Sequence, residues 1–207
     1  MFIMPVMFDD GDSSGIIEAM LTSSHIAVEV DGRIIKVDPY AAVRELEAGI
    51  AKWLVENNEV LIPRQELARA ADDVFRKRAC GSNKNCKYII YDESDKMVSL
   101  DEALDTVLLR RSNIYQVYAG TYVLLPLDTR FWRYRGGQRL WYFLNVVSKL
   151  VELFAADGLG IVMSYGDLVY KIAEAYCRLF LGGECKNPIE LYYRELAKFY
   201  DIPLRRA

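Results

Sequence analysis

The chain has 207 residues, a formal net charge of −3 at neutral pH and an apolar fraction of 52%. This composition suits one substantial core, or one domain with a helical extension. No run of about eighteen apolar residues occurs, which argues against a membrane-spanning helix. The N-terminus lacks the basic flank and cleavage site of a signal peptide, so a cytoplasmic protein is expected. Arginine outnumbers lysine and glutamine is scarce, which favours a thermophilic source.

The first predicted element is a β-hairpin. Two alternating apolar runs flank Asp31-Gly32, and an Asp-Gly pair is typical of a two-residue turn because both positions need a positive φ. The pattern predicts strands over residues 25–30 and 33–37.

Two helices are expected next. Asp38 is a suitable cap and Pro39 suits the first helical position, and this helix should end near Asn57. A second helix is predicted from Pro63 to Arg78, with apolar residues at helical spacing.

A loop, a strand, a helix and a second hairpin should follow. The segment "CGSNKNC" has loop composition, and "KYIIYDE" after it reads as a short strand. Ser99 and Glu102 have capping-box spacing, which predicts a helix over residues 100–110. The segment "NIYQVYAGTYVLLPLD" predicts two strands joined by a tight turn.

The last third of the chain has helical patterns only. A long helix from Gly137 is apolar around most of its circumference, which predicts burial on several sides. A further helix is predicted over residues 165–181, and the last should begin at Asn187-Pro188. The fold class is therefore α+β: an α+β domain over residues 1–136 with a small antiparallel sheet, and a helical region for packing and oligomerisation over residues 137–207.

The four cysteines form two local pairs, Cys80 with Cys86 and Cys177 with Cys185. Five and seven residues separate the members, which is wider than usual in zinc sites. No metal or other cofactor is expected. Two short disulfides and partly buried free thiols are the alternatives.

Few residues suggest catalysis. His25 is the only histidine, and no nucleophile elbow, phosphate loop or dinucleotide fingerprint is present. Carboxylates cluster near the N-terminus, at Asp72-Asp73 and around Asp92. A two-metal nuclease would need such groups to converge, but each cluster also fits ordinary surface. The sequence therefore predicts a protein that is not an enzyme.

The segment 110–139 concentrates positive charge. It contains six arginines, no lysine and one acid, Asp128, so it carries +5 and leaves −8 for the rest of the chain. Aromatic residues are interleaved with these arginines, most densely in "TRFWRYRGGQRLWYF". Proteins that bind single strands combine a positive groove with stacking rings, and arginine both stacks and binds phosphate bidentately.

Ordinary packing is the alternative explanation. In an extended segment Phe131, Arg133 and Arg135 would share one face, and Trp132 and Tyr134 the other. Rings directed inward and arginines directed outward would give the same pattern, because aromatic residues are favoured in strands.

The chain resembles the ThermoDBP single-stranded DNA-binding proteins of hyperthermophilic archaea and their related proteins. It resembles them in three ways: its size, the order of an α+β part before a helical part, and the arginine and aromatic stretch 110–143. The resemblance implies a compact α+β domain with helical assembly, a cleft of basic and apolar residues, nonspecific single-strand binding and a homo-oligomer. No residue is carried over from that family.

The sequence thus predicts a sequence-tolerant protein that binds single-stranded DNA, with RNA as an alternative ligand. A non-catalytic helical subunit of a larger archaeal complex is the other hypothesis, in which the same helix is an interface and the arginines meet an acidic partner. The candidate binding residues follow from charge and rings alone: Arg110, Arg111, Tyr115, Tyr118, Arg130, Phe131, Trp132, Arg133, Tyr134, Arg135 and Arg139.

Overall fold

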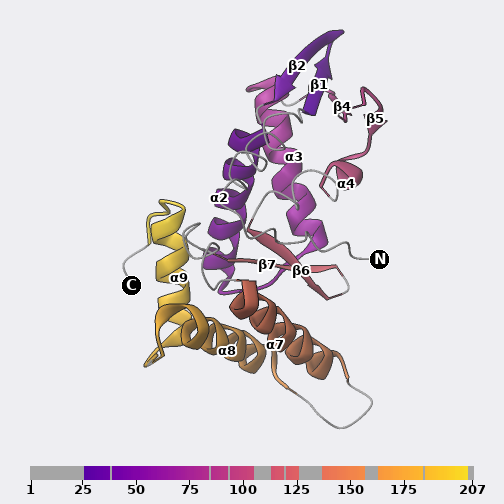
Figure 1. Cartoon of the computed structure of the whole chain (residues 1–207). Coiled ribbons are helices and arrows are strands. Elements are labelled where there is room, and N and C mark those ends of the chain that lie inside the picture. The colour runs from indigo at the N-terminus through magenta and orange to yellow at the C-terminus, as the bar shows by residue number, and fades with distance from the viewer. Residues whose placement is uncertain are drawn as a thin grey trace, which may run out of the picture.

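The structure is a computed structural model, and it confirms the α+β class. Helices combine with two antiparallel sheets, one of four strands and one of three. Figure 1 shows the four-stranded sheet at one end of the molecule and helices α7 and α8 at the other. The structure describes residues 26–37, 39–83, 85–92, 94–104, 113–118, 120–125, 137–156, 163–183 and 185–204.

The four-stranded sheet begins with the predicted hairpin. Its turn has φ of 51° at Asp31 and 75° at Gly32, the left-handed pair that the Asp-Gly sequence indicated. The strand order is β2-β1-β4-β5, so the chain adds β4 to the other edge of β1 after two helices. The strands are β1 (Ile26–Val30), β2 (Arg33–Val37), β4 (Ile89–Tyr91) and β5 (Met97–Val98).

The second sheet was not expected as a separate unit. The predicted second hairpin forms β6 (Ile114–Tyr118) and β7 (Thr121–Leu124), with Gly120 at a φ of 86° in its turn. A short strand, β3 (Ile62–Pro63), pairs with the outer edge of β7. This pairing joins segments about sixty residues apart, which local sequence patterns do not report.

In the part of the chain that the structure describes, three helices precede the second sheet's hairpin. Ser99 and Glu102 form the predicted capping box of α4. Pro63, predicted as the start of α3, is its N-cap, and Asp38, the predicted cap of α2, lies outside the described residues. The structure describes α4 only to Ala103, so the predicted continuation to residue 110 lies outside the described residues. The helices are α2 (Pro39–Asn57), α3 (Arg64–Cys80) and α4 (Leu100–Ala103).

The C-terminal part is helical, as predicted. The side chain of Asn187 accepts a hydrogen bond from the Glu190 N–H at the start of α9. The helix predicted over residues 165–181 is α-helical to Tyr176 and then widens into one π-helical turn. The elements are α7 (Gly137–Ala155), α8 (Tyr165–Tyr176), the π-helix η4 (Cys177–Leu181) and α9 (Pro188–Phe199). Across the described ranges, no helix is both long enough and apolar enough to cross a bilayer.

One continuous core unites the two halves of the sequence. Buried side chains of α2, α3 and both sheets belong to the same cluster as Phe143 of α7, Ile172 of α8 and Leu196 of α9. The buried Tyr192 hydroxyl donates a hydrogen bond of 2.9 Å to the Leu124 carbonyl, which ties α9 to β7. Helices α7, α8 and α9 therefore pack on the α+β part, and this packing fixes the position of α7.

The cysteines form two disulfides in the structure, Cys80–Cys86 and Cys177–Cys185. This is one of the two alternatives that the sequence left open. The first bond joins the end of α3 to the segment before β4, and the second joins the start of η4 to the segment before α9. Each bond closes a short loop at the end of a helix.

Glu47 of α2 places a carboxylate in the core, with 6% of its surface exposed. Burial raises the pKa of this carboxyl, and the Asn113 N–H, which donates to its Oε1 at 2.5 Å, opposes the rise together with the charge of Arg44. The charged form is therefore less favourable in the folded chain than in the unfolded chain.

Replacing Glu47 with glutamine should give a pH-dependent gain in stability. An acid with a raised pKa holds its proton more tightly in the folded state, so the parent chain loses stability as pH rises from about 4.5 through the folded-state pKa. Glu47→Gln lacks this loss, so its advantage over the parent should be larger at pH 7.5 than at pH 4.5. Urea unfolding at both pH values measures the difference, and a gap that is independent of pH would contradict this role for Glu47.

Candidate nucleic-acid interface

The structure describes three of the eleven predicted binding residues. Tyr115 and Tyr118 lie on β6, and Arg139 lies in the first turn of α7. Nothing is placed for the other eight, which lie outside the described residues: Arg110, Arg111, Arg130, Phe131, Trp132, Arg133, Tyr134 and Arg135.

The aromatic residues around this segment divide between core and surface. Tyr122 and Phe143 are buried, at 1% and 0% exposure, and pack in the core. Tyr115 is half-buried against the core, where burial and the nearby charge of Glu47 raise the pKa of its hydroxyl. These three rings therefore offer less surface for stacking than an open platform requires.

Helix α7 has one buried face and one open face. Leu140, Phe143, Val147 and Val151 recur every three or four residues and are buried. The exposed positions follow a second stripe at the same period, so the helix is less completely buried than its composition predicted. This open stripe consists of Gln138, Trp141, Tyr142, Asn145, Lys149 and Glu152.

Two large rings stand open on that face. Trp141 is 58% exposed and Tyr142 is 59% exposed, although the same helix buries Phe143 completely. Asn145 lies one turn after Trp141, and its side chain donates a hydrogen bond of 2.8 Å to the Trp141 carbonyl. This bond links two positions of the open face. These two exposed rings offer apolar surface to a ligand or a partner.

Arg139 precedes these rings by two and three positions. Its side chain is exposed, and Nη1 donates a hydrogen bond of 3.3 Å to the Leu179 carbonyl in η4. A guanidinium carries five N–H donors and can bind a phosphate bidentately. Figure 1 shows α7 next to α8, and η4, which continues α8, supplies this carbonyl.

Trp141 and Tyr142 were not among the predicted binding residues. Both lie in the quoted stretch, but the helix was predicted to be apolar around most of its circumference and buried on several sides. The period of its polar residues could have found them, because Gln138, Asn145 and Lys149 define the solvent side on which both rings fall.

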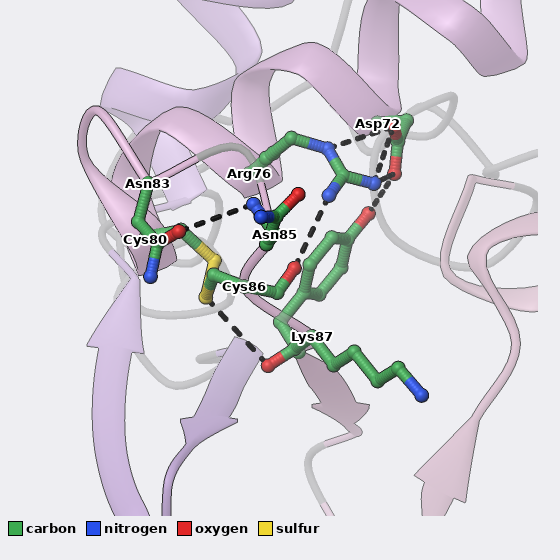
Figure 2. Close-up of a disulfide and its surroundings, with 8 residues drawn as sticks. Asp72, Arg76, Cys80, Asn83, Asn85, Cys86 and Lys87 are labelled. Carbon is green, nitrogen blue, oxygen red and sulfur yellow. Dashed lines mark hydrogen bonds and ion pairs between the residues drawn. A yellow bond between two sulfur atoms is a disulfide. The ribbon is translucent and has the colours of Figure 1, made fainter.

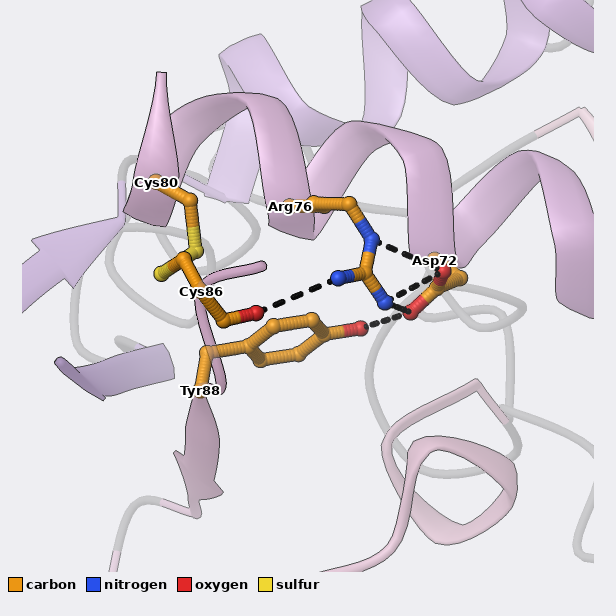
Figure 3. Close-up of polar contacts among 5 residues, drawn as sticks. All are labelled: Asp72, Arg76, Cys80, Cys86 and Tyr88. Atoms are coloured by element: carbon orange, nitrogen blue, oxygen red, sulfur yellow. Dashed lines mark hydrogen bonds and ion pairs between the residues drawn. A yellow bond between two sulfur atoms is a disulfide. The ribbon is translucent and has the colours of Figure 1, made fainter. Parts of the chain in front are cut away.

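A second polar cluster lies at the other end of the molecule, between α3 and β4. Arg76 donates to the Asp72 carboxylate at 3.1 and 3.3 Å and to the Cys86 carbonyl at 3.2 Å, while the Tyr88 hydroxyl donates to Asp72 at 2.5 Å (Figure 3). Burial and the bond to Asp72 raise the pKa of Tyr88, so its hydroxyl stays protonated. These groups satisfy one another and brace the loop that the Cys80–Cys86 disulfide closes (Figure 2).

An open cavity of about 520 Å³ lies over this cluster, with Lys87, Met97 and Ser99 among its lining residues. The described part of the chain contains no group of three or more acidic, histidine or cysteine side chains arranged to hold a metal ion. Asp72 is engaged by Arg76 and Tyr88, and Asp92 accepts N–H bonds from Ser94 and Lys96 in a turn. These two carboxylates of the nuclease alternative therefore have structural partners, whereas His25 lies outside the described residues.

Comparison of the chain with family models, with curated proteins and with solved structures gave no match.

Proposed function

We propose that this protein binds single-stranded nucleic acid, with DNA as the first ligand to test, and that it does so without sequence preference and without catalysis. The observation that carries the proposal is the pair of open rings, Trp141 and Tyr142, which follow the exposed Arg139 in the first turns of α7. Every base has a face that can stack on such a ring, so this chemistry tolerates any sequence.

Charge supports the same ligand. The arginine-rich segment ends where α7 begins, with Arg133 and Arg135 only four and two positions before Gly137. An excess of +5 in this segment of an otherwise acidic chain suits a polyanion. On this proposal the arginines attract and bind phosphates while the rings of α7 stack with bases.

Replacing Arg133 and Arg135 together with alanine should weaken binding and reduce its salt dependence. If each guanidinium binds one phosphate, the slope of log K against log salt should fall in magnitude by about 1.4, since each single-strand phosphate contributes about 0.7. Fluorescence titration of labelled oligo-dT across a salt series measures the slope.

The control should change net charge equally at a distant place. Arg33 and Lys36 are exposed on β2, in the four-stranded sheet at the far end from α7 (Figure 1). Arg33→Ala with Lys36→Ala should leave the slope near the parent value. Equal effects of the two double variants would mean that general charge governs binding, and would remove Arg133 and Arg135 from the site.

A helical assembly subunit is the second candidate, because Phe154 is also exposed on α7, at 37%. The open rings would then meet another protein chain, and the arginines an acidic surface. We also propose a homo-oligomer for the nucleic-acid-binding form. Light scattering with and without oligo-dT separates the candidates: an oligomer that gains mass with the oligonucleotide favours the first, and a chain that ignores it favours the second.

A further inference from the structure

The two disulfides close loops that differ in the hydrogen bonds that support them besides the disulfide. Hydrogen bonds within the Cys80–Cys86 loop support it besides the disulfide. The Asn83 N–H donates to the Cys80 carbonyl, and the Cys86 N–H donates to the Asn83 carbonyl. The Asn85 N–H donates to the Asn83 side chain. Arg76 adds a bond to the Cys86 carbonyl (Figure 2). This loop should therefore keep its shape when its disulfide is reduced.

The Cys177–Cys185 loop is supported unevenly. Its first part, η4, is held by the Arg178–Glu174 ion pair and by the contacts of Leu179 and Phe180. Among the described contacts of Gly182, Gly183 and Cys185, we find no hydrogen bond or ion pair. Gly182 and Gly183 have φ values of 99° and 116°, which glycine adopts readily. Because glycine has no Cβ, it also leaves the backbone freer than other residues would. The disulfide thus ties η4 to the segment before α9.

The Cys177–Cys185 disulfide is attached to η4, the π-helical turn that contacts α7. Cys177 is the first residue of η4, and π-helical turns are rare, so such a turn depends on its surroundings. Leu179 of η4 accepts the Arg139 hydrogen bond, and the Phe180 ring lies 5.6 Å from the Phe143 ring in an edge-to-face contact. Arg139 and Phe143 flank Trp141 and Tyr142 on α7.

We propose that the Cys177–Cys185 disulfide is a redox-sensitive element that holds the open face of α7 in its binding form. The part that concerns nucleic acid rests on the proposed function. Reduction frees η4, loosens its contacts with Arg139 and Phe143, and leaves Trp141 and Tyr142 less firmly placed. An oxidised protein then binds a single strand more tightly than a reduced one, because a preorganised surface loses less freedom on binding.

The chemistry needs a dithiol reductant. Cys177 is fully buried, whereas Cys185 is only half-buried and follows exposed residues, so a thiolate of the reductant attacks the Cys185 sulfur. The bond to Cys177 breaks and Cys177 leaves as a thiolate. The second thiol of the reductant then releases Cys185, both cysteines take up protons, and the reductant ends as a disulfide.

The experiment compares the two disulfides by alanine substitution. Cys177→Ala with Cys185→Ala should raise the Kd for oligo-dT about fivefold, and dithiothreitol should do the same to the parent chain. Cys80→Ala with Cys86→Ala should change the Kd less than twofold. Equal effects of the two pairs, or no effect of the first pair on a parent that binds, would overturn the proposal.

A second measurement works without nucleic acid. With Trp53→Phe and Trp132→Phe, Trp141 is the only tryptophan. Acrylamide quenching of Trp141 should increase when Cys177–Cys185 is removed and stay constant when Cys80–Cys86 is removed. Unchanged quenching in both cases would refute the redox element. If the oxidised parent does not bind oligo-dT but quenching responds as expected, the proposed function fails and the control of α7 by this disulfide stands.

Discussion

Alanine at both Trp141 and Tyr142 is expected to weaken oligo-dT binding by at least about thirtyfold. Stacking of one base on one ring contributes roughly 1–3 kcal/mol, so two rings give at least about 2 kcal/mol. Both side chains are more than half exposed, so their loss should leave the core intact. Fluorescence anisotropy of a labelled oligo-dT measures the change in Kd, and circular dichroism checks the fold.

A matched control uses another exposed ring. Phe199 lies on α9, is 45% exposed, and contacts the Tyr200 ring with a centroid distance of 4.9 Å. Phe199→Ala removes a ring of similar exposure outside α7 and should change the Kd less than twofold. If Phe199→Ala matches the α7 double variant, or if the double variant binds as the parent does, the rings of α7 are not the stacking surface.

Removal of both disulfides should lower the free energy of unfolding by about 5 kcal/mol. Each bond restrains a short loop of the unfolded chain, which by the chain-entropy relation is worth roughly 2–3 kcal/mol. For a chain of this length the loss corresponds to a fall in Tm of about 10–20 °C. Calorimetry of the oxidised protein and of the reduced, alkylated protein compares the two states.

The separate contributions can be resolved with the two paired alanine variants. Since the loops lie at different ends of the fold, their effects on stability should add within about 0.5 kcal/mol. A reduced protein that melts at the temperature of the oxidised one would show that neither cystine constrains the chain.

Much of the local structure was predictable because its causes are local. Asp31-Gly32 needs only its own left-handed φ values to define the hairpin, and Ser99 with Glu102 satisfies the free amides of a helix start without distant help. Asn187 followed by Pro188 marks the start of α9 for the same reason.

The parts that sequence reasoning missed depend on distant contacts. Ile62 pairs with Tyr122 across sixty positions, so the division of the strands into two sheets has no local signal. The π-helical turn that ends α8 follows a continuous helical pattern and depends on its tertiary surroundings.

The sequence selected segment 110–143 for the candidate site, but it did not select the two open rings of α7 on which the proposal now depends. The charge of segment 110–139 directed attention to the start of α7. Composition alone did not separate the buried Phe143 from the open Trp141 and Tyr142, because all three are large and adjacent. The side of α7 that packs on the core determines which rings are buried, and Leu140, Val147 and Val151 mark that side.

Titration of fluorescein-labelled oligo-dT with the oxidised protein at 50 mM and 200 mM salt tests the central claim most directly. We expect a Kd in the micromolar range or below at low salt, and a steep loss of affinity at high salt as phosphate-bound counterions are no longer released as favourably. Absence of binding at 50 mM salt, or a Kd that salt does not change, would contradict the account of α7 and its arginines as a surface for single strands.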